Sequence, residues 1–137
     1  MYISNTNIKV RYAETDRMGI VHHSNYYVWF EEARGDFIEK INITYKEVED
    51  MGIMMPIMET HCKYMRASKY GDIIEIKTSI KELTPVKILF DYRVINKKSG
   101  ELLAKGGTTQ TFINNDFKII NMEKKYPEIW KKFQTLQ

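Results

Sequence analysis

The segment that most constrains the fold is a predicted helix that begins near Asn25 and runs to about Asn42. Its apolar residues recur at helical spacing, and Tyr26 through Phe30 form an unbroken apolar and aromatic run. A helix that is apolar nearly all round its first turns has to be surrounded by other structure. Gly35 lies inside this helix, where glycine costs about 1 kcal/mol relative to alanine. We therefore predict that a neighbouring backbone approaches closely at Gly35.

The rest of the chain is predicted to be mostly strand. A short helix from Tyr45 to Met51 ends at Gly52, and a final amphipathic helix has Pro127 in its first turn and buries Ile129, Trp130 and Phe133. Alternation at period two predicts strands at residues 8–12, 55–66, 74–81, 86–94, 102–113 and 118–120. The order of strand, helix and then several antiparallel strands predicts one α+β domain over residues 1–137, with the sheet wrapped around one long central helix.

Composition narrows the class of protein. The net charge of +3, without a run of like charges, argues against nucleic acid as a partner. Cys62 is the only cysteine, which excludes an internal disulfide and favours a reducing cytoplasm. The N-terminal residues lack a secretion signal, and no apolar run approaches the roughly 20 residues of a membrane span. His22, His23 and His61 lack the spacing of a metal site, and no motif requires a cofactor.

A polar loop separates the first predicted strand from the helix. It contains Glu14-Thr15-Asp16-Arg17, then Gly19 and the two histidines. Ser24 or Asn25 is predicted to cap the helix, because a short polar side chain can accept a hydrogen bond from its first free N–H groups. A carboxylate and imidazoles are thus held just before the positive end of a helix dipole. That arrangement suits chemistry on a carbonyl that becomes anionic.

The stretch RYAETDRMGIVHHSNYYVWFEEAR, at residues 11–34, resembles the signature of the 4-hydroxybenzoyl-CoA thioesterase family, whose members are hotdog-fold acyl-CoA thioesterases. The matching positions are Tyr12, Glu14-Thr15-Asp16, Gly19-Ile20-Val21, His23, Asn25-Tyr26 and Glu31-Glu32-Ala33-Arg34. Strand order and chain length match as well, so the resemblance covers nearly the whole chain. One departure is His22, where the family often has tyrosine.

The resemblance implies a hotdog fold and a homodimer or homotetramer with active sites at subunit interfaces. It implies that Asp16 is the catalytic carboxylate and His23 its partner, with the backbone N–H of His23 as donor to the thioester oxygen. Asp16 would act as nucleophile or as general base for water. The residues expected to bind substrate are Tyr12, Gly19, Val21, Asn25, Tyr26, Lys69 and Lys87. Of these, Lys69 and Lys87 could contact the phosphates of coenzyme A, as could Arg66.

Several readings stay open at this level. Asp16 also fits a turn residue that hydrogen-bonds its own backbone. Met51, Met54, Met55 and Met58 fit either an acyl pocket or the core. The alternatives to an acyl-CoA thioesterase are an acyl-carrier-protein thioesterase and a hotdog protein that binds acyl-CoA without hydrolysing it. The sequence leaves acyl length and aromatic or aliphatic character undecided.

Overall fold

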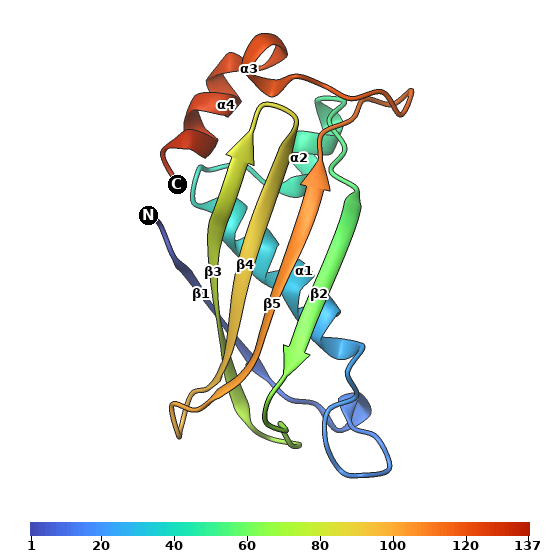
Figure 1. Cartoon of the computed structure of the whole chain (residues 1–137), viewed down its shortest axis with the longest axis vertical. Helices are drawn as coiled ribbons and strands as arrows, with labels where there is room; N and C mark the ends of the chain where they lie inside the picture. Colours follow the sequence, from blue (N-terminus) through green and yellow to red (C-terminus); the bar gives the residue numbers. More distant parts are fainter.

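The computed structural model describes all 137 residues and shows a five-stranded antiparallel sheet with α1 lying across it (Figure 1). The strands are β1 (Ser4–Lys9), β2 (Ile57–Tyr64), β3 (Ile73–Thr84), β4 (Lys87–Asn96) and β5 (Leu102–Thr111), in the spatial order β1-β3-β4-β5-β2. The helices are α1 (Asn25–Glu39), α2 (Tyr45–Asp50), α3 (Met122–Lys125) and α4 (Pro127–Gln134), with a 3-10 turn at Tyr12–Glu14. The predicted α+β class with an antiparallel sheet is confirmed.

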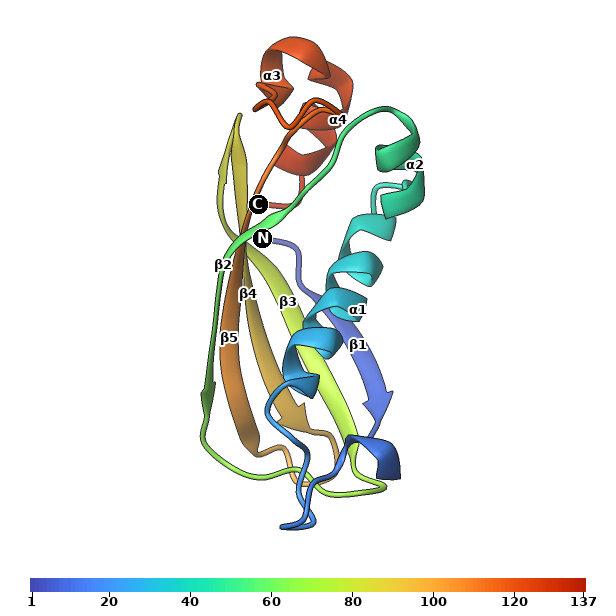
Figure 2. The same ribbon diagram turned by 90° about the vertical axis from the view of Figure 1, so that its right-hand side faces the viewer.

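The core lies between α1 and the sheet. Figure 2 shows α1 and α2 on one face of the sheet, while the opposite face carries no helix along most of its length. Trp29, Phe30 and Phe37 of α1 are fully buried against the face of the sheet that α1 covers. The ring of Phe30 stacks on that of Tyr92 in β4, with centroids 4.2 Å apart and planes 8° apart. The apolar run at the start of α1 is therefore covered on the side that faces the sheet, but Val28 is 56% exposed, so the prediction that other structure surrounds the helix holds for one side only.

The structure does not contain the single long helix that was predicted from Asn25 to Asn42. α1 has 15 residues and ends at Glu39, and the other helices are shorter. After Glu39 the backbone tightens, because Ile41 N–H donates to the carbonyl of Ile38 and Asn42 N–H to that of Glu39. Asn42 then adopts φ 58°, a left-handed conformation in which asparagine often ends a helix.

The close approach of helix and sheet occurs at Gly106 rather than at Gly35, so the prediction for Gly35 is wrong. A Cβ atom added at Gly35 would meet nothing within 4 Å. A Cβ added at Gly106 of β5 would lie 2.6 Å from the ring of Phe30 and 2.8 Å from the carbonyl oxygen of His61. The glycine that makes room for α1 is thus in the sheet, and the pattern of residues within the helix could not predict its position.

Two further predicted elements differ from the structure, and one short helix was not predicted. Tyr12 belongs to the 3-10 turn instead of the first strand, because the side chain of Glu14 accepts a hydrogen bond from the N–H of Arg11 and closes the turn. Residues 118–120 form no strand and contribute only the isolated bridge between Ile113 and Ile119. The short α3 precedes α4 and was not predicted. α4 itself is confirmed: Pro127 occupies its first turn, and its apolar residues are buried.

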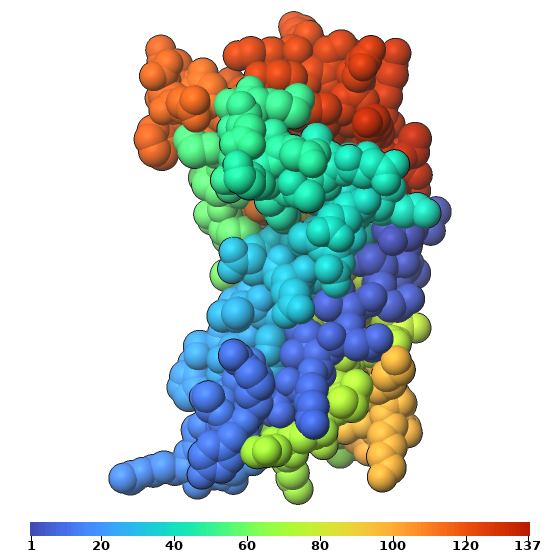
Figure 3. Space-filling view, turned by 180° about the vertical axis from the view of Figure 1, so that it is seen from behind, coloured from blue at the N-terminus to red at the C-terminus, as the bar shows by residue number.

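β2 forms one edge of the sheet. Figure 3 shows the face that carries α1 and α2, with β1 on one side and β2 on the other. Seven of the eight residues of β2 are exposed, and the eighth, Cys62, is half-buried. No helix of the protein is long and apolar enough to cross a membrane.

Candidate active site

Glu14 holds the loop that carries Asp16 against α1. Its carboxylate is buried and accepts a 2.8 Å hydrogen bond from the indole N–H of Trp29. Its backbone carbonyl accepts hydrogen bonds from the N–H of His22 at 2.8 Å and from the side-chain amide of Asn25 at 2.9 Å. Residue 25, predicted to bind substrate, therefore fastens the loop to the first turn of α1.

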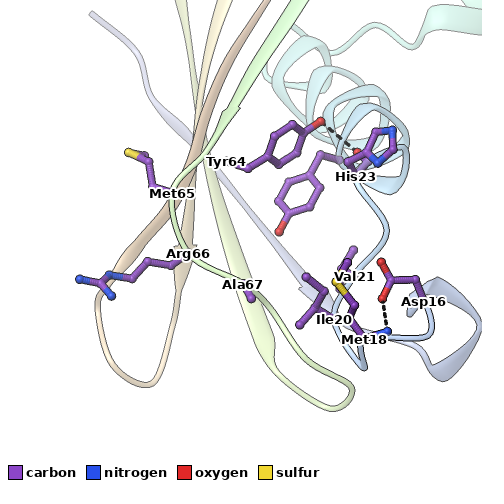
Figure 4. Close-up of a pocket in the computed structure, with 10 residues that line it drawn as sticks. Asp16, Met18, Ile20, Val21, His23, Tyr64, Met65, Arg66 and Ala67 are labelled. Atoms are coloured by element: carbon purple, nitrogen blue, oxygen red, sulfur yellow. Dashed lines mark hydrogen bonds between the residues drawn. The ribbon is translucent and has the colours of Figure 1, made fainter.

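Asp16 is both a turn residue and part of a cavity wall. Its Oδ1 accepts a 2.8 Å hydrogen bond from the backbone N–H of Met18 (Figure 4). Its carbonyl accepts from the N–H of Gly19, which adopts φ 78° and closes the turn. The other carboxylate oxygen accepts no hydrogen bond within the chain. The half-buried carboxylate is thus held by the turn and keeps one oxygen free.

The start of α1 provides an unused donor. Ser24 occupies the N-cap position without a capping hydrogen bond, because its hydroxyl lies 2.8 Å from Nδ1 of His22 instead. The backbone N–H of His23 donates to no group of the chain. The carbonyl of His23 accepts hydrogen bonds from the hydroxyl of Tyr64 at 3.1 Å and from the N–H of Tyr26 at 3.3 Å. The peptide unit preceding the helix is thereby held at its carbonyl while the N–H of His23 stays free.

A cavity of about 270 Å³ lies between this loop, the start of α1 and the end of β2. It brings together four of the predicted site residues, Asp16, Val21, His23 and Tyr26 (Figure 4). The other lining residues are Met18, Ile20, Tyr64, Met65, Arg66 and Ala67. The cavity therefore combines a carboxylate and an imidazole with mostly apolar walls.

Two tyrosines form an uncharged wall of this cavity. Tyr26 and Tyr64 pack edge to face, with centroids 5.0 Å apart. Burial raises the pKa of Tyr26, although its 2.9 Å hydrogen bond to Ser68 acts in the opposite direction. Partial burial and the neighbouring Cys62 also raise the pKa of Tyr64 above its ordinary value, although 42% of the residue is exposed. Both phenols therefore stay neutral at physiological pH and can donate hydrogen bonds.

The remaining predicted substrate residues lie outside the cavity wall. The side chain of Tyr12 is 76% exposed and packs against Tyr70. Gly19 shapes the turn after Asp16, and Lys69 forms a backbone bridge with Ile20 at the edge of the cavity. Lys87 pairs with Thr111 of β5, whereas Tyr64 pairs with Ala104, so Lys87 stands at the other end of the sheet from the cavity.

Sequence reasoning missed the contributions of Tyr64 and Met65. Tyr64 ends β2 and Met65 follows it, far along the chain from the Asp16 loop, and neither residue was predicted to bind substrate. The four methionines considered for an acyl pocket do not line this cavity, and Met18 and Met65 do. No group of three histidine, cysteine or acidic side chains is arranged to hold a metal ion.

Comparison with known proteins gives consistent matches. The family model for the thioesterase-like superfamily matches residues 10–130. A Bacillus subtilis protein with the provisional name acyl-CoA thioesterase YneP is 33% identical over 129 residues, which are 93% of each chain. The acyl-CoA thioesterase YbgC of Haemophilus influenzae is 28% identical over 89 residues, covering 64% of this chain and 65% of that protein. The structure of DHNA-CoA thioesterase from Staphylococcus aureus superposes with a TM-score of 0.92 at 34% identity, covering 98% of this chain and 90% of that one.

Proposed function

The chain belongs to the thioesterase-like superfamily, and we propose that it hydrolyses the thioester of an acyl-CoA to a free carboxylic acid and coenzyme A. The observation that carries the proposal is that Asp16 and His23 line the same cavity. At that cavity a carboxylate oxygen and a backbone N–H both lack a partner within the chain. These are an attacking group or base, and a donor for an oxyanion, which are the two components that thioester hydrolysis needs.

In the proposed reaction the thioester carbonyl lies between Asp16 and the start of α1. Asp16 either attacks the carbonyl carbon, giving a mixed anhydride that water then hydrolyses, or removes a proton from an attacking water. In both routes the carbonyl oxygen becomes negative and coenzyme A leaves as the thiolate. The N–H of His23 and the helix dipole, equivalent to about half a unit of positive charge, stabilise that oxygen.

The walls of the cavity support an apolar acyl group. Met18, Ile20, Val21 and Met65 offer apolar surface that can adapt to different acyl shapes. Arg66 lines the cavity with 68% of its side chain exposed, although it pairs with Glu101 at 3.0 Å. We assign Arg66 and the neighbouring Lys69 to the phosphates of coenzyme A.

A lone half-buried Cys62 supports a reducing compartment such as the cytoplasm.

We also propose that the chain assembles as a homodimer or homotetramer through β2. An edge strand with open backbone groups is a template for pairing with another strand. β2 has such an edge, and Ile57, Met58 and Tyr64 expose 42%, 65% and 42% of their surfaces on it. Lys87, remote from the cavity within its own chain, would require such an assembly to reach a substrate.

A thiol-release assay tests the proposed hydrolysis. Purified protein would be assayed with short-chain, long-chain and aromatic acyl-CoAs. In parallel assays it would be given the acyl-carrier-protein thioester of each same acyl group. We expect saturable release of coenzyme A from at least one acyl-CoA class. Tight binding of acyl-CoAs with no turnover of any would identify a binding protein instead, and turnover of carrier-protein thioesters alone would move the activity to that substrate.

A further inference from the structure

The face of the sheet opposite α1 carries a row of basic side chains. Figure 1 looks onto this face, with β3, β4, β5 and β2 side by side in front of α1. Lys77 of β3 pairs with Arg93 of β4, and Arg93 pairs with Lys105 of β5. Lys105 pairs in turn with Lys63 of β2. These four residues stand directly opposite one another on neighbouring strands, and we call them the basic row.

The side chains of the basic row point away from α1. Successive side chains of a strand alternate between the two faces of a sheet. The strand neighbours Ile76, Val94 and Ala104 are buried in the core, so the basic residues beside them face outward, where they are exposed. On β2, Tyr64 lines the candidate active site, and the preceding Lys63 is exposed on the other face. The basic row is therefore separated from the candidate active site by the sheet itself.

The basic row has almost no acidic partner within the chain. Lys77 lies 3.9 Å from the carboxylate of Glu75, and the other three basic residues form no ion pair. Like charges directly opposite one another destabilise a sheet. A lysine on an edge strand opposes aggregation, which accounts for Lys63. It does not account for Arg93 and Lys105, because β4 and β5 have neighbours on both sides.

Acidic residues beside the basic row limit its width. Glu75 lies two residues before Lys77 on β3, and Asp91 lies two residues before Arg93 on β4, so both share the face of the row. Because β3 and β4 are antiparallel, these two carboxylates flank the row on opposite sides. A broad anionic surface, such as a membrane, would meet the carboxylates as well as the cations. The row therefore suits a narrow anionic partner.

The length of the basic row matches an α-helix. Neighbouring strands lie about 4.8 Å apart, so the row spans about 14 Å. A helix rises about 1.5 Å per residue, so acidic residues at positions i, i+3, i+7 and i+10 lie on one face over about 15 Å. An extended segment repeats about every 6.7 Å on one face and would place fewer carboxylates over the same length.

We propose that the basic row docks an acidic helix of a partner protein, laid across β3, β4, β5 and β2 with its carboxylates on one face. Each carboxylate of the helix meets one cation of the row. The cations are exposed, so the complex is weak, forms quickly and is sensitive to salt.

Fluorescence anisotropy tests this surface with two labelled, alanine-rich peptides of about 18 residues, a length at which such sequences form helix. One carries four glutamates at positions i, i+3, i+7 and i+10, and the other has the same composition with its glutamates spread around the helix. We expect the first peptide to bind saturably and at least about fivefold more tightly than the second. Its affinity should fall at least about tenfold between about 20 and about 200 mM salt. Equal affinities for the two peptides, or no saturable binding, would overturn the proposal.

Lys105→Glu interrupts the basic row at its centre. It places a carboxylate between Arg93 and Lys63, so the thermal midpoint should be unchanged or raised. The affinity for the first peptide should fall about tenfold. Lys132→Glu is the matched control, because it makes the same change of charge at an exposed residue of α4, outside the sheet, and it should keep the affinity within about twofold. Equal losses in the two variants would show an effect of net charge and contradict the proposal.

Two further measurements distinguish other partners of the basic row. Binding to vesicles of phosphatidylserine and phosphatidylcholine that Lys105→Glu abolishes, without peptide binding, would assign the row to a membrane. Loss of self-association in Lys105→Glu would assign it to a contact between copies of the chain. Either result would overturn the docking of a partner helix. Thiol release by Lys105→Glu should equal that of the wild type, so a failure of the proposed hydrolysis is distinguishable from a failure of this proposal.

Discussion

At the scale of single residues, His23 illustrates how a side chain and its backbone can have separate roles. The donor assigned to the oxyanion is its backbone N–H, which has no partner within the chain. The imidazole is exposed and packs against that of His22, with centroids 4.2 Å apart. We therefore predict that His23→Ala lowers kcat for the best acyl-CoA by less than about tenfold, since it keeps the N–H, whereas loss of an oxyanion donor costs about a hundredfold or more. Steady-state thiol release measures this.

A loss of a hundredfold or more in His23→Ala, with the fold intact by circular dichroism, would contradict a backbone role and assign the imidazole to catalysis. His22→Ala is the matched control, because His22 does not line the cavity. It should stay within a fewfold of the wild type.

At the scale of elements, the packing of α1 on the sheet depends on the space at Gly106. A methyl group there would overlap the ring of Phe30 and the carbonyl of His61, so Gly106→Ala should lower the free energy of unfolding by about 1–3 kcal/mol. Gly35→Ala has open space and a helical backbone, so it should raise that free energy by about 0.5–1 kcal/mol. Urea denaturation of both variants compares the two. A loss of stability in Gly35→Ala together with no loss in Gly106→Ala would contradict this placement of the close approach.

Gly35 and Gly106 also show what the sequence could and could not predict. The alternation around Ile74 and Ile76 and the helical spacing after Asn25 are local, so the five strands of the sheet and α1 could be predicted within a few residues, whereas the strand predicted at residues 118–120 does not form. Ser24 or Asn25 was predicted to cap α1 with its side chain, and Ser24 does occupy the N-cap position, but the predicted capping hydrogen bond is absent because the Ser24 hydroxyl contacts His22. Contacts between distant elements left no local pattern. The hydrogen bond from Tyr64 to His23 joins residues 41 apart in sequence.

At the scale of the whole molecule, the exposed β2 edge leads to a prediction about assembly. The wild type should sediment at micromolar concentration as a dimer or tetramer of its 16.3 kDa chain. Met58→Lys puts a charge on an exposed position of β2 and should weaken association at least about tenfold while leaving the fold intact, because lysine on an edge strand opposes pairing. Analytical ultracentrifugation across a concentration series measures both. A monomeric wild type with full activity would rule out the assembly.

The central claim is that Asp16 carries the hydrolysis, and Asp16→Asn tests it most directly. Asparagine keeps the size of the side chain and can still accept the hydrogen bond from Met18, so the turn should survive. It can act neither as a carboxylate nucleophile nor as a base, so both routes lose their attacking group. The account predicts that turnover of the best acyl-CoA falls at least about a hundredfold while acyl-CoA binding persists. Near wild-type hydrolysis by purified Asp16→Asn would contradict it.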